Sequence, residues 1–183
     1  MSLLDTPVCD FGWQAPDFTL KDPNGNAFSM RDNLGAKGLV VAFICNHCPY
    51  VKAIADRFAA DADTLMGEGI GVVSVMSNNW RDYREDSPPN MLKFAAAHGF
   101  NFPYLIDEDQ SVGKAWGAVC TPDFFGLNAN GQLQYRGRFD DVGMRGDAAE
   151  RTPDLVDAMR LIAATGEGPR EQVASMGCSI KWV

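Results

Sequence analysis

Two cysteines separated by two residues are the strongest chemical signal in the sequence. Cys45 and Cys48 belong to the stretch VAFICNHCPYVKA, residues 41–53, which begins within an apolar run. An amphipathic pattern follows it, so the thiols are expected where a buried strand ends and a helix begins. In α/β proteins, ligand-binding and active sites usually lie at this carboxyl edge of the sheet. Free N–H groups and the helix dipole there lower the pKa of a thiol.

The spacing of the two thiols predicts redox chemistry. A thiol three residues after a reactive thiolate lies one helical turn away, so it can attack the mixed disulfide that the first thiol forms. His47 lies between them and would stabilise a thiolate if its ring were protonated or suitably oriented, although an ordinary polar surface position is the alternative. Two cysteines that serve only as small core residues are the less favoured interpretation.

Zinc binding is the other chemistry that these residue types allow. A structural zinc ion takes four ligands, and the CxxC loop offers three. The chain has no second CxxC pair, so Cys120, Cys178 or His98 would have to complete the set. A zinc- or partner-binding module without turnover therefore stays open, while the favoured interpretation expects no metal and no other cofactor.

The composition is typical of a soluble globular protein. The chain has 183 residues and a formal net charge of -8, which disfavours nucleic acid as a partner. No apolar run reaches the roughly 18 residues of a membrane span, and the N-terminus lacks the basic and apolar segments of a signal peptide. A cytoplasmic location without membrane contact is therefore expected. In that compartment the five cysteines are not expected to form a structural disulfide framework.

The apolar patterns predict an α/β fold. Continuous apolar runs at 38–44 and 70–77 predict buried strands, and the three- and four-residue spacing from Val51 to Met66 predicts one helix between them. A strand–helix–strand unit with short joints predicts that the two strands are parallel. Further expected elements are hairpins at 18–30 and 123–139, a strand at 102–107, and helices at 89–98 (with Ser87 as N-cap), 111–117 and 153–164. Residues 1–183 are predicted to form a single domain, with 166–183 as a C-terminal tail packed on it.

Several motifs in order resemble one family. CNHCPYVKA, YREDSPPNM, AVCTPDFF, YRGRFDD and GCSIKW are similar to motifs of the CxxC-containing, peroxiredoxin-like subgroup of the redoxins, the AhpC/TSA branch of the thioredoxin-like superfamily. The match runs from about residue 8 to 183. The resemblance implies a thioredoxin-like fold: a central mixed β-sheet flanked by helices, with an N-terminal β-hairpin and a peroxiredoxin-type insertion.

The resemblance also implies roles. Cys45 matches the nucleophilic thiol of thioredoxin and Cys48 the resolving thiol. Thr121 and Pro122 match the cis-proline turn that faces the CxxC motif and pairs with substrate backbone. The implied activity is thiol–disulfide oxidoreductase, and the implied context is cell redox homeostasis. The implied substrate is a protein or small-molecule disulfide, the implied electron donor a thiol of the thioredoxin or glutathione type, and the chain would be a monomer or a homodimer.

A thiol-dependent peroxidase is the alternative within the same family. Cys48 followed by Pro49 matches the peroxidatic position of peroxiredoxins, which would make Cys45 the resolving thiol. The family's threonine falls at Cys45, however, and its arginine falls at about Thr121–Pro122. Without these polar donors fast peroxide reduction is not expected, unless Arg138 approaches from another strand.

Two further thiols are candidates for a redox role. Cys120 lies two residues before Pro122 and is expected near the dithiol, either as a third redox thiol or as a half-buried small residue. Cys178 lies in the tail, where it either folds back as an extra resolving thiol or packs.

Overall fold

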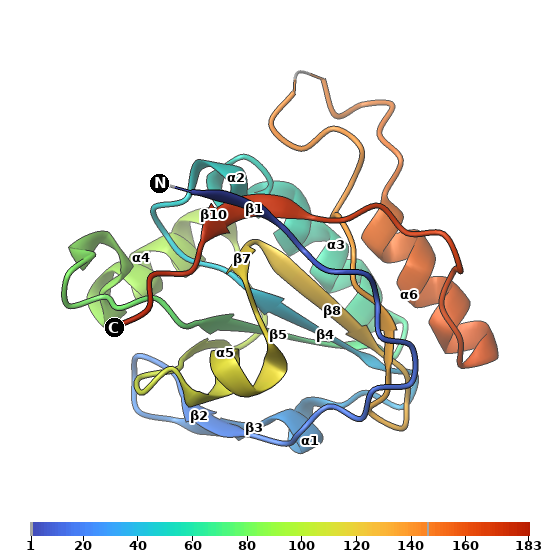
Figure 1. Cartoon of the computed structure of the whole chain (residues 1–183), viewed down its shortest axis with the longest axis horizontal. Helices are drawn as coiled ribbons and strands as arrows, with labels where there is room; N and C mark the ends of the chain where they lie inside the picture. Colours follow the sequence, from blue (N-terminus) through green and yellow to red (C-terminus); the bar gives the residue numbers. More distant parts are fainter. Residues whose placement is uncertain (1, 146) are drawn as a thin grey trace.

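A seven-stranded mixed sheet forms the centre of the computed structural model, which describes residues 2–145 and 147–183 (Figure 1). Its strand order is β3-β2-β6-β5-β4-β8-β9. The strands are β2 (Thr19–Lys21), β3 (Ala27–Ser29), β4 (Leu39–Phe43), β5 (Gly71–Met76), β6 (Tyr104–Ile106), β8 (Asp123–Leu127) and β9 (Leu133–Tyr135). Strands β4, β5 and β6 are parallel, whereas β2–β3 and β8–β9 are antiparallel hairpins. The predicted parallel pair and both predicted hairpins are therefore confirmed.

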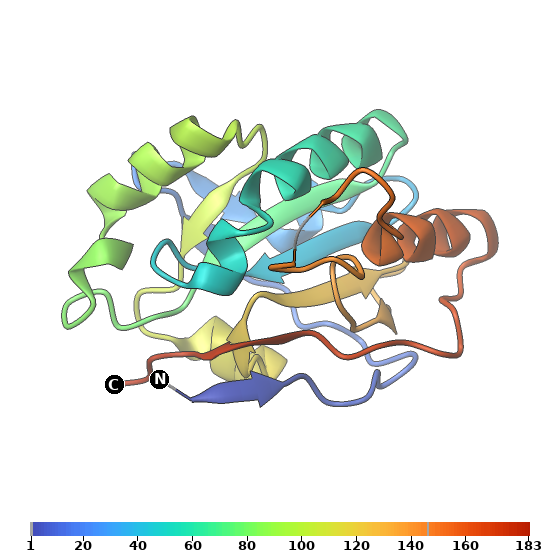
Figure 2. The same cartoon turned by 90° about the horizontal axis from the view of Figure 1, so that it is seen from above.

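Helices cover both faces of this sheet (Figure 2). They are α1 (Met30–Asn33), α2 (Pro49–Lys52), α3 (Ala55–Gly67), α4 (Pro88–His98), α5 (Ser111–Trp116) and α6 (Asp154–Thr165), with a 3₁₀ helix η1 (Arg84–Asp86). Side chains of α3, α4 and α6 pack on one face and those of α5 on the other. No helix of the described residues is long and apolar enough to cross a membrane.

Strand β4 supports the CxxC motif and is buried on both faces. Val40 and Ala42 contact the core under α3 and α6, whereas Val41 and Phe43 contact the core around Trp116. Burial of a large apolar side chain contributes about 1.5–3 kcal/mol, so this strand holds the following loop firmly. The continuous apolar run predicted this two-sided burial.

The helix predicted from Val51 to Met66 is interrupted, so that prediction is wrong in its continuity. The chain makes a turn between α2 and α3, in which the Ile54 amide bonds the Val51 carbonyl at 3.1 Å. The Arg57 guanidinium donates to the Ala53 carbonyl at 3.0 Å and so satisfies a backbone acceptor at the break.

The helix predicted at 89–98 is present as α4. Ser87 is its N-cap, although the Ser87 side chain makes no capping hydrogen bond, and Gly99 ends the helix at φ 72°.

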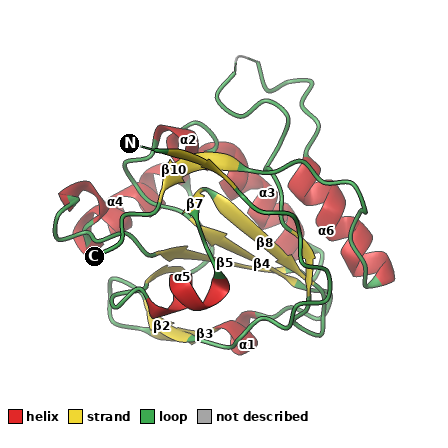
Figure 3. Cartoon of the chain, in the orientation of Figure 1, coloured by secondary structure: helices red, strands yellow, loops and turns green. Residues whose placement is uncertain are grey.

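A second, three-stranded sheet joins the two ends of the chain. It consists of β1 (Leu3–Asp5), β10 (Met176–Ser179) and β7 (Cys120–Thr121), in the order β1-β10-β7 with antiparallel pairs (Figure 3). The sequence predicted no strand at β1 and placed β10 only within the C-terminal tail. Since β7 leads through Pro122 into β8, this sheet lays the C-terminal segment beside the turn that faces the CxxC motif.

Candidate active site: a three-thiol cluster

The CxxC loop lies at the junction that its sequence predicted. Cys45 follows β4 by two residues, and Cys48 is the N-cap of α2 with Pro49 in the first helical position. The Cys48 carbonyl accepts the amides of Val51 and Lys52 at 3.1 and 3.0 Å. Pro49 fits here because the first helical residue needs no N–H.

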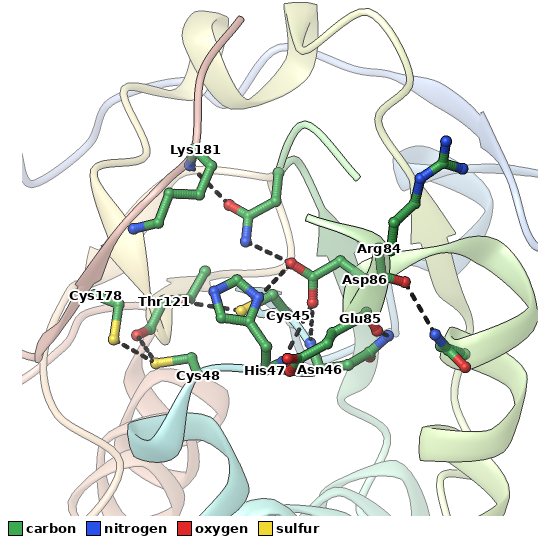
Figure 4. Close-up of polar contacts among 12 residues, drawn as sticks. Cys45, Asn46, His47, Cys48, Arg84, Glu85, Asp86, Thr121, Cys178 and Lys181 are labelled. Atoms are coloured by element: carbon green, nitrogen blue, oxygen red, sulfur yellow. Dashed lines mark hydrogen bonds and ion pairs between the residues drawn. The ribbon is translucent and has the colours of Figure 1, made fainter. Parts of the chain in front are cut away.

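A buried carboxylate, Asp86, holds the loop from the opposite side. One oxygen accepts the backbone amides of Asn46 and His47 at 2.8 and 3.2 Å, and the other bonds His47 Nδ1 at 2.6 Å and Asn78 Nδ2 at 3.0 Å (Figure 4). Burial alone would raise the pKa of Asp86, but the hydrogen bonds from His47 and Asn78 hold this pKa below its ordinary value. The sequence analysis missed Asp86, although the acidic residues of YREDSPPNM were the available signal.

The His47 ring bonds Asp86, the carboxylate that anchors the loop, rather than a sulfur atom. The ring also stacks on Tyr83 at 5.7 Å between centroids. The hydrogen bond to Asp86 raises the pKa of His47. Among the described residues none of its hydrogen bonds reaches Cys45 or Cys48, so direct stabilisation of a thiolate by His47 stays a prediction without a contact to support it.

The turn at Thr121–Pro122 faces the dithiol, and its peptide bond is cis, as expected. Thr121 Oγ1 lies 3.5 Å from Cys45 Sγ, and the Thr121 carbonyl lies 3.2 Å from Cys48 Sγ. One residue of β7 therefore contacts both sulfur atoms.

The structure brings Cys178 to the dithiol and leaves Cys120 aside. Cys178 Sγ lies 3.0 Å from Cys48 Sγ (Figure 4). Cys120 Sγ is directed at the Pro122 carbonyl, at 3.6 Å, and its side chain is fully buried rather than half-buried. Burial raises the pKa of Cys120.

The negative charge of the three-thiol cluster, Cys45, Cys48 and Cys178, is concentrated on Cys48. Its pKa falls to about 4, chiefly through the interaction with the Cys45 thiol and, against the effect of burial, through the Cys178 thiol and the Thr121 side chain. The Thr121 carbonyl, by contrast, accepts a hydrogen bond from the protonated Cys48 thiol. The interaction with Cys48, together with burial, raises the pKa of Cys45. Burial raises the pKa of Cys178 to about 12. All three thiols are free and almost fully buried.

One group of side chains could contribute metal ligands. One potential ligand atom each from Cys45, His47 and Asp86 lies within 4.8 Å of the others. Three ligands are one fewer than a structural zinc site takes, and both Asp86 oxygens already accept two hydrogen bonds each. The arrangement is better explained as the anchor of the CxxC loop.

A groove of about 420 Å³ adjoins the cis-proline turn. Its lining includes Pro122, Tyr50 and Met176, together with Arg138. The Arg138 guanidinium bonds Asp154 at 2.6 Å and makes no hydrogen bond to a sulfur atom within the part of the chain that the structure describes. A wider groove of about 900 Å³ lies between β2 and α5. No cysteine lines either groove, but the smaller one includes Pro122 of the turn that faces the dithiol.

A CxxC loop between a strand and a helix, facing a cis-proline turn, defines a thioredoxin-like redox protein. The comparisons agree: the AhpC/TSA family profile matches residues 11–136, and the chain belongs to this family.

Among curated relatives, a Mycobacterium tuberculosis protein named provisionally as a peroxiredoxin is 29% identical, over 72% of this chain and 79% of its own length. The thiol-disulfide oxidoreductase ResA of Bacillus subtilis is 27% identical, over 67% of this chain and 64% of its own length. Both kinds of relative support a thiol-based oxidoreductase.

Solved structures support the fold. An uncharacterised conserved protein from Geobacillus kaustophilus is 37% identical with a TM-score of 0.92, covering 100% of this chain and 97% of that one. A secreted disulfide oxidoreductase of Mycobacterium tuberculosis is 19% identical with a TM-score of 0.58, covering 78% and 92%. The fold is therefore thioredoxin-like, a mixed sheet flanked by helices.

Proposed function

We propose that the protein is a thiol–disulfide oxidoreductase whose redox couple is the Cys45–Cys48 dithiol and disulfide. The observation that carries the proposal is the placement of both sulfur atoms against Thr121, beside the cis-proline turn. The hydrogen bonds that converge on Cys48 favour the thiolate there. Cys48 is therefore proposed as the attacking thiol, the reverse of the order implied by the thioredoxin resemblance.

In the proposed cycle the Cys48 thiolate attacks a substrate disulfide. The substrate S–S bond breaks, one substrate thiolate leaves with the electron pair, and a Cys48 mixed disulfide forms. Cys45 then gives up its proton and attacks Cys48 Sγ, which releases the second substrate thiol and closes the Cys45–Cys48 disulfide. The substrate gains two electrons and the two cysteines lose them. The two substrate thiolates take up one proton that Cys45 gives up and one from water, because Cys48 reacts as the thiolate.

The substrate is proposed to be a protein or small-molecule disulfide. The groove beside Pro122 and Met176 supports a polypeptide substrate, because its lining includes both apolar and charged side chains. A thiol donor of the thioredoxin or glutathione type, in the cytoplasm, would return the disulfide to the dithiol.

The test is reduction of a fluorescent glutathione disulfide with dithiothreitol as donor. Cys48→Ser should lower the rate to that of dithiothreitol alone. Cys45→Ser should slow turnover, and glutathione should be found on Cys48 as a transient mixed disulfide when the reaction is quenched in acid. Cys120→Ser is the matched control and should keep the wild-type rate. If Cys48→Ser instead collects glutathione on Cys45, the attacking order is the thioredoxin one. If both single variants keep the full rate, the proposed function is wrong.

A peroxidase is the second candidate, favoured by the low pKa of Cys48 and by the following Pro49. Cys48 would then be peroxidatic and Cys45 resolving. The second-order rate of the reduced protein with hydrogen peroxide, with the oxidised cysteine mapped by mass spectrometry, decides the question. We expect the rate of an ordinary thiolate. A rate about a hundredfold higher, the effect of one well-placed donor, with first oxidation at Cys48, would make peroxide a substrate.

A further inference from the structure

We propose that Cys178 is a third redox thiol, which exchanges with the Cys45–Cys48 disulfide to form a Cys48–Cys178 disulfide that fastens strand β10 over the site. The inference rests on the proposed function and adds to it an internal partner for Cys48.

The first observation is contact between the sulfur atoms. Cys178 Sγ lies 3.0 Å from Cys48 Sγ, although the residues are 130 positions apart in sequence. A disulfide bond is about 2.05 Å long, so bond formation requires an approach of about 1 Å. Cys48 is thus the middle sulfur of the cluster, within reach of a partner on each side.

The second observation is the register that directs Cys178 inward. Cys178 lies opposite Thr121 in the antiparallel pair β10–β7, and directly opposed residues point to the same face of a sheet. Thr121 Oγ1 already contacts Cys45 on that face. A shift of one residue would turn Cys178 away from the dithiol.

The third observation is that β10 is held in this register from several sides. Leu3 of β1 pairs with Cys178 on its other edge, and the Ser175 hydroxyl donates to the Pro122 carbonyl at 2.8 Å. Gly177 allows the close approach, because a Cβ at this position would overlap the Thr121 carbonyl. Cys178 is therefore fixed where its sulfur contacts Cys48.

The exchange needs no oxidant beyond the disulfide of the cycle. Cys178 loses its proton and attacks Cys48 Sγ; the Cys48–Cys178 bond forms and the Cys45–Cys48 bond breaks. Cys45 leaves with the electron pair and takes up a proton. One disulfide and one thiol are present before and after, so no net oxidation occurs.

The exchange has a consequence for access. Cys45, Cys48 and Cys178 are almost fully buried, and β10 occupies the backbone position opposite Thr121 that a bound polypeptide was expected to take. An external disulfide reaches the cluster only when β10 moves. The Cys48–Cys178 bond would hold β10 in place, so this oxidised form would exclude substrate until a donor thiol reduces it.

Disulfide mapping tests the exchange. Reduced protein is treated with one equivalent of diamide, quenched in acid, alkylated and mapped by mass spectrometry. The wild type should contain mainly Cys45–Cys48 with a minor Cys48–Cys178 fraction, and Cys45→Ser and Cys45→Ala should contain mostly Cys48–Cys178. Adding Cys120→Ser to either variant should change nothing.

The outcomes separate the two proposals. If the wild type forms Cys45–Cys48 but both Cys45 variants form only intermolecular disulfides or none, the inference about Cys178 is wrong and the proposed function stands. If the wild type forms no Cys45–Cys48 bond, the proposed function is wrong, and the exchange that starts from this bond is wrong with it.

Release of bound glutathione gives a second readout. Cys45→Ser carrying glutathione on Cys48 should lose it through attack by Cys178, whereas the double variant with Cys178→Ser should retain it at least tenfold longer. The double variant with Cys120→Ser should behave as the single variant does. Equal retention in all three would overturn the inference.

Discussion

The two faces of the small sheet β1-β10-β7 carry two cysteines with different surroundings. Cys178 and Cys120 come from adjacent strands, both are almost fully buried, and burial raises the pKa of each. Only Cys178 contacts Cys48, because it shares the inner face with Thr121. Cys120 shares the outer face with Ser179. Strand register, rather than burial or distance along the chain, decides which thiol joins the cluster.

The charges beside the two faces differ as well. On the inner face the Cys45 and Cys178 thiols lower the pKa of Cys48 and favour its thiolate, although the Thr121 carbonyl accepts a hydrogen bond from the Cys48 thiol at 3.2 Å. Near the outer face Asp123 is paired with Arg136 at 2.8 Å, and the same guanidinium also donates to the Gly117 carbonyl. Asp123 raises the pKa of Cys120 and Arg136 lowers it, so the two charges oppose each other and burial favours the neutral thiol at Cys120.

The largest expected effect is on the acid titration of the thiolate. In the reduced wild type, thiolate absorbance should persist as the pH falls and disappear through about 4. Cys48→Ser should remove this transition entirely. Cys178→Ala should raise its midpoint, because a hydrogen-bond donor is lost, while Cys120→Ala should leave it unchanged. An unchanged midpoint in Cys178→Ala would contradict the proposed difference between the two faces.

The same pKa predicts how stability depends on pH. A thiol in an unfolded chain titrates near 8.5, so the folded state holds fewer protons at Cys48 between about 4 and 8.5. The resulting stabilisation is fully present above the unfolded value and is lost as the pH falls through about 4. Over that window the free energy of unfolding should fall more for the reduced wild type than for Cys48→Ser.

The next largest effect is expected at the anchor of the CxxC loop. Asp86→Asn removes a buried carboxylate that accepts four hydrogen bonds, so it should cost about 2–4 kcal/mol in the free energy of unfolding measured with urea. It should also lower the yield of Cys48–Cys178, because the loop no longer holds Cys48 against the inner face. Asp82→Asn, at an exposed position of the same segment, should change the free energy by less than about 0.5 kcal/mol. Equal stability of the two variants would contradict the anchoring role.

What the sequence could predict is the local part of this arrangement. Continuous apolar runs locate β4 and β5, and the motif order indicates the cis bond at Pro122. These features depend on residues close together in the chain. At the break after α2 the Arg57 side chain bonds the Ala53 carbonyl, an interaction that helical periodicity does not predict.

The non-local part was beyond prediction for physical reasons. Asp86 is one of several acidic residues in its segment, and only the tertiary fold selects it for burial. The inward direction of Cys178 depends on the register of β10 against β7, and a slip of one residue reverses it. The sequence alone does not specify that pairing, so both Cys120 and Cys178 stayed candidates for a redox role.

The smallest effect concerns packing in the reduced state, where the two faces should behave alike. Cys178→Ala and Cys120→Ala each remove a sulfur atom from a buried site, which should cost about 1 kcal/mol in the free energy of unfolding. Urea unfolding of both variants in a Cys48→Ser background under dithiothreitol checks this, because no Cys48 thiolate then contributes to the difference. If both variants lose the same free energy of unfolding, the two cysteines pack alike, and the two faces differ in redox chemistry alone. If Cys178→Ala lowers the free energy of unfolding more than about twice as much as Cys120→Ala does, the packing of β10 depends on the Cys178 side chain. Variants at Cys178 would then disturb the fold, and the Cys48–Cys178 disulfide would have to be demonstrated in the wild-type protein.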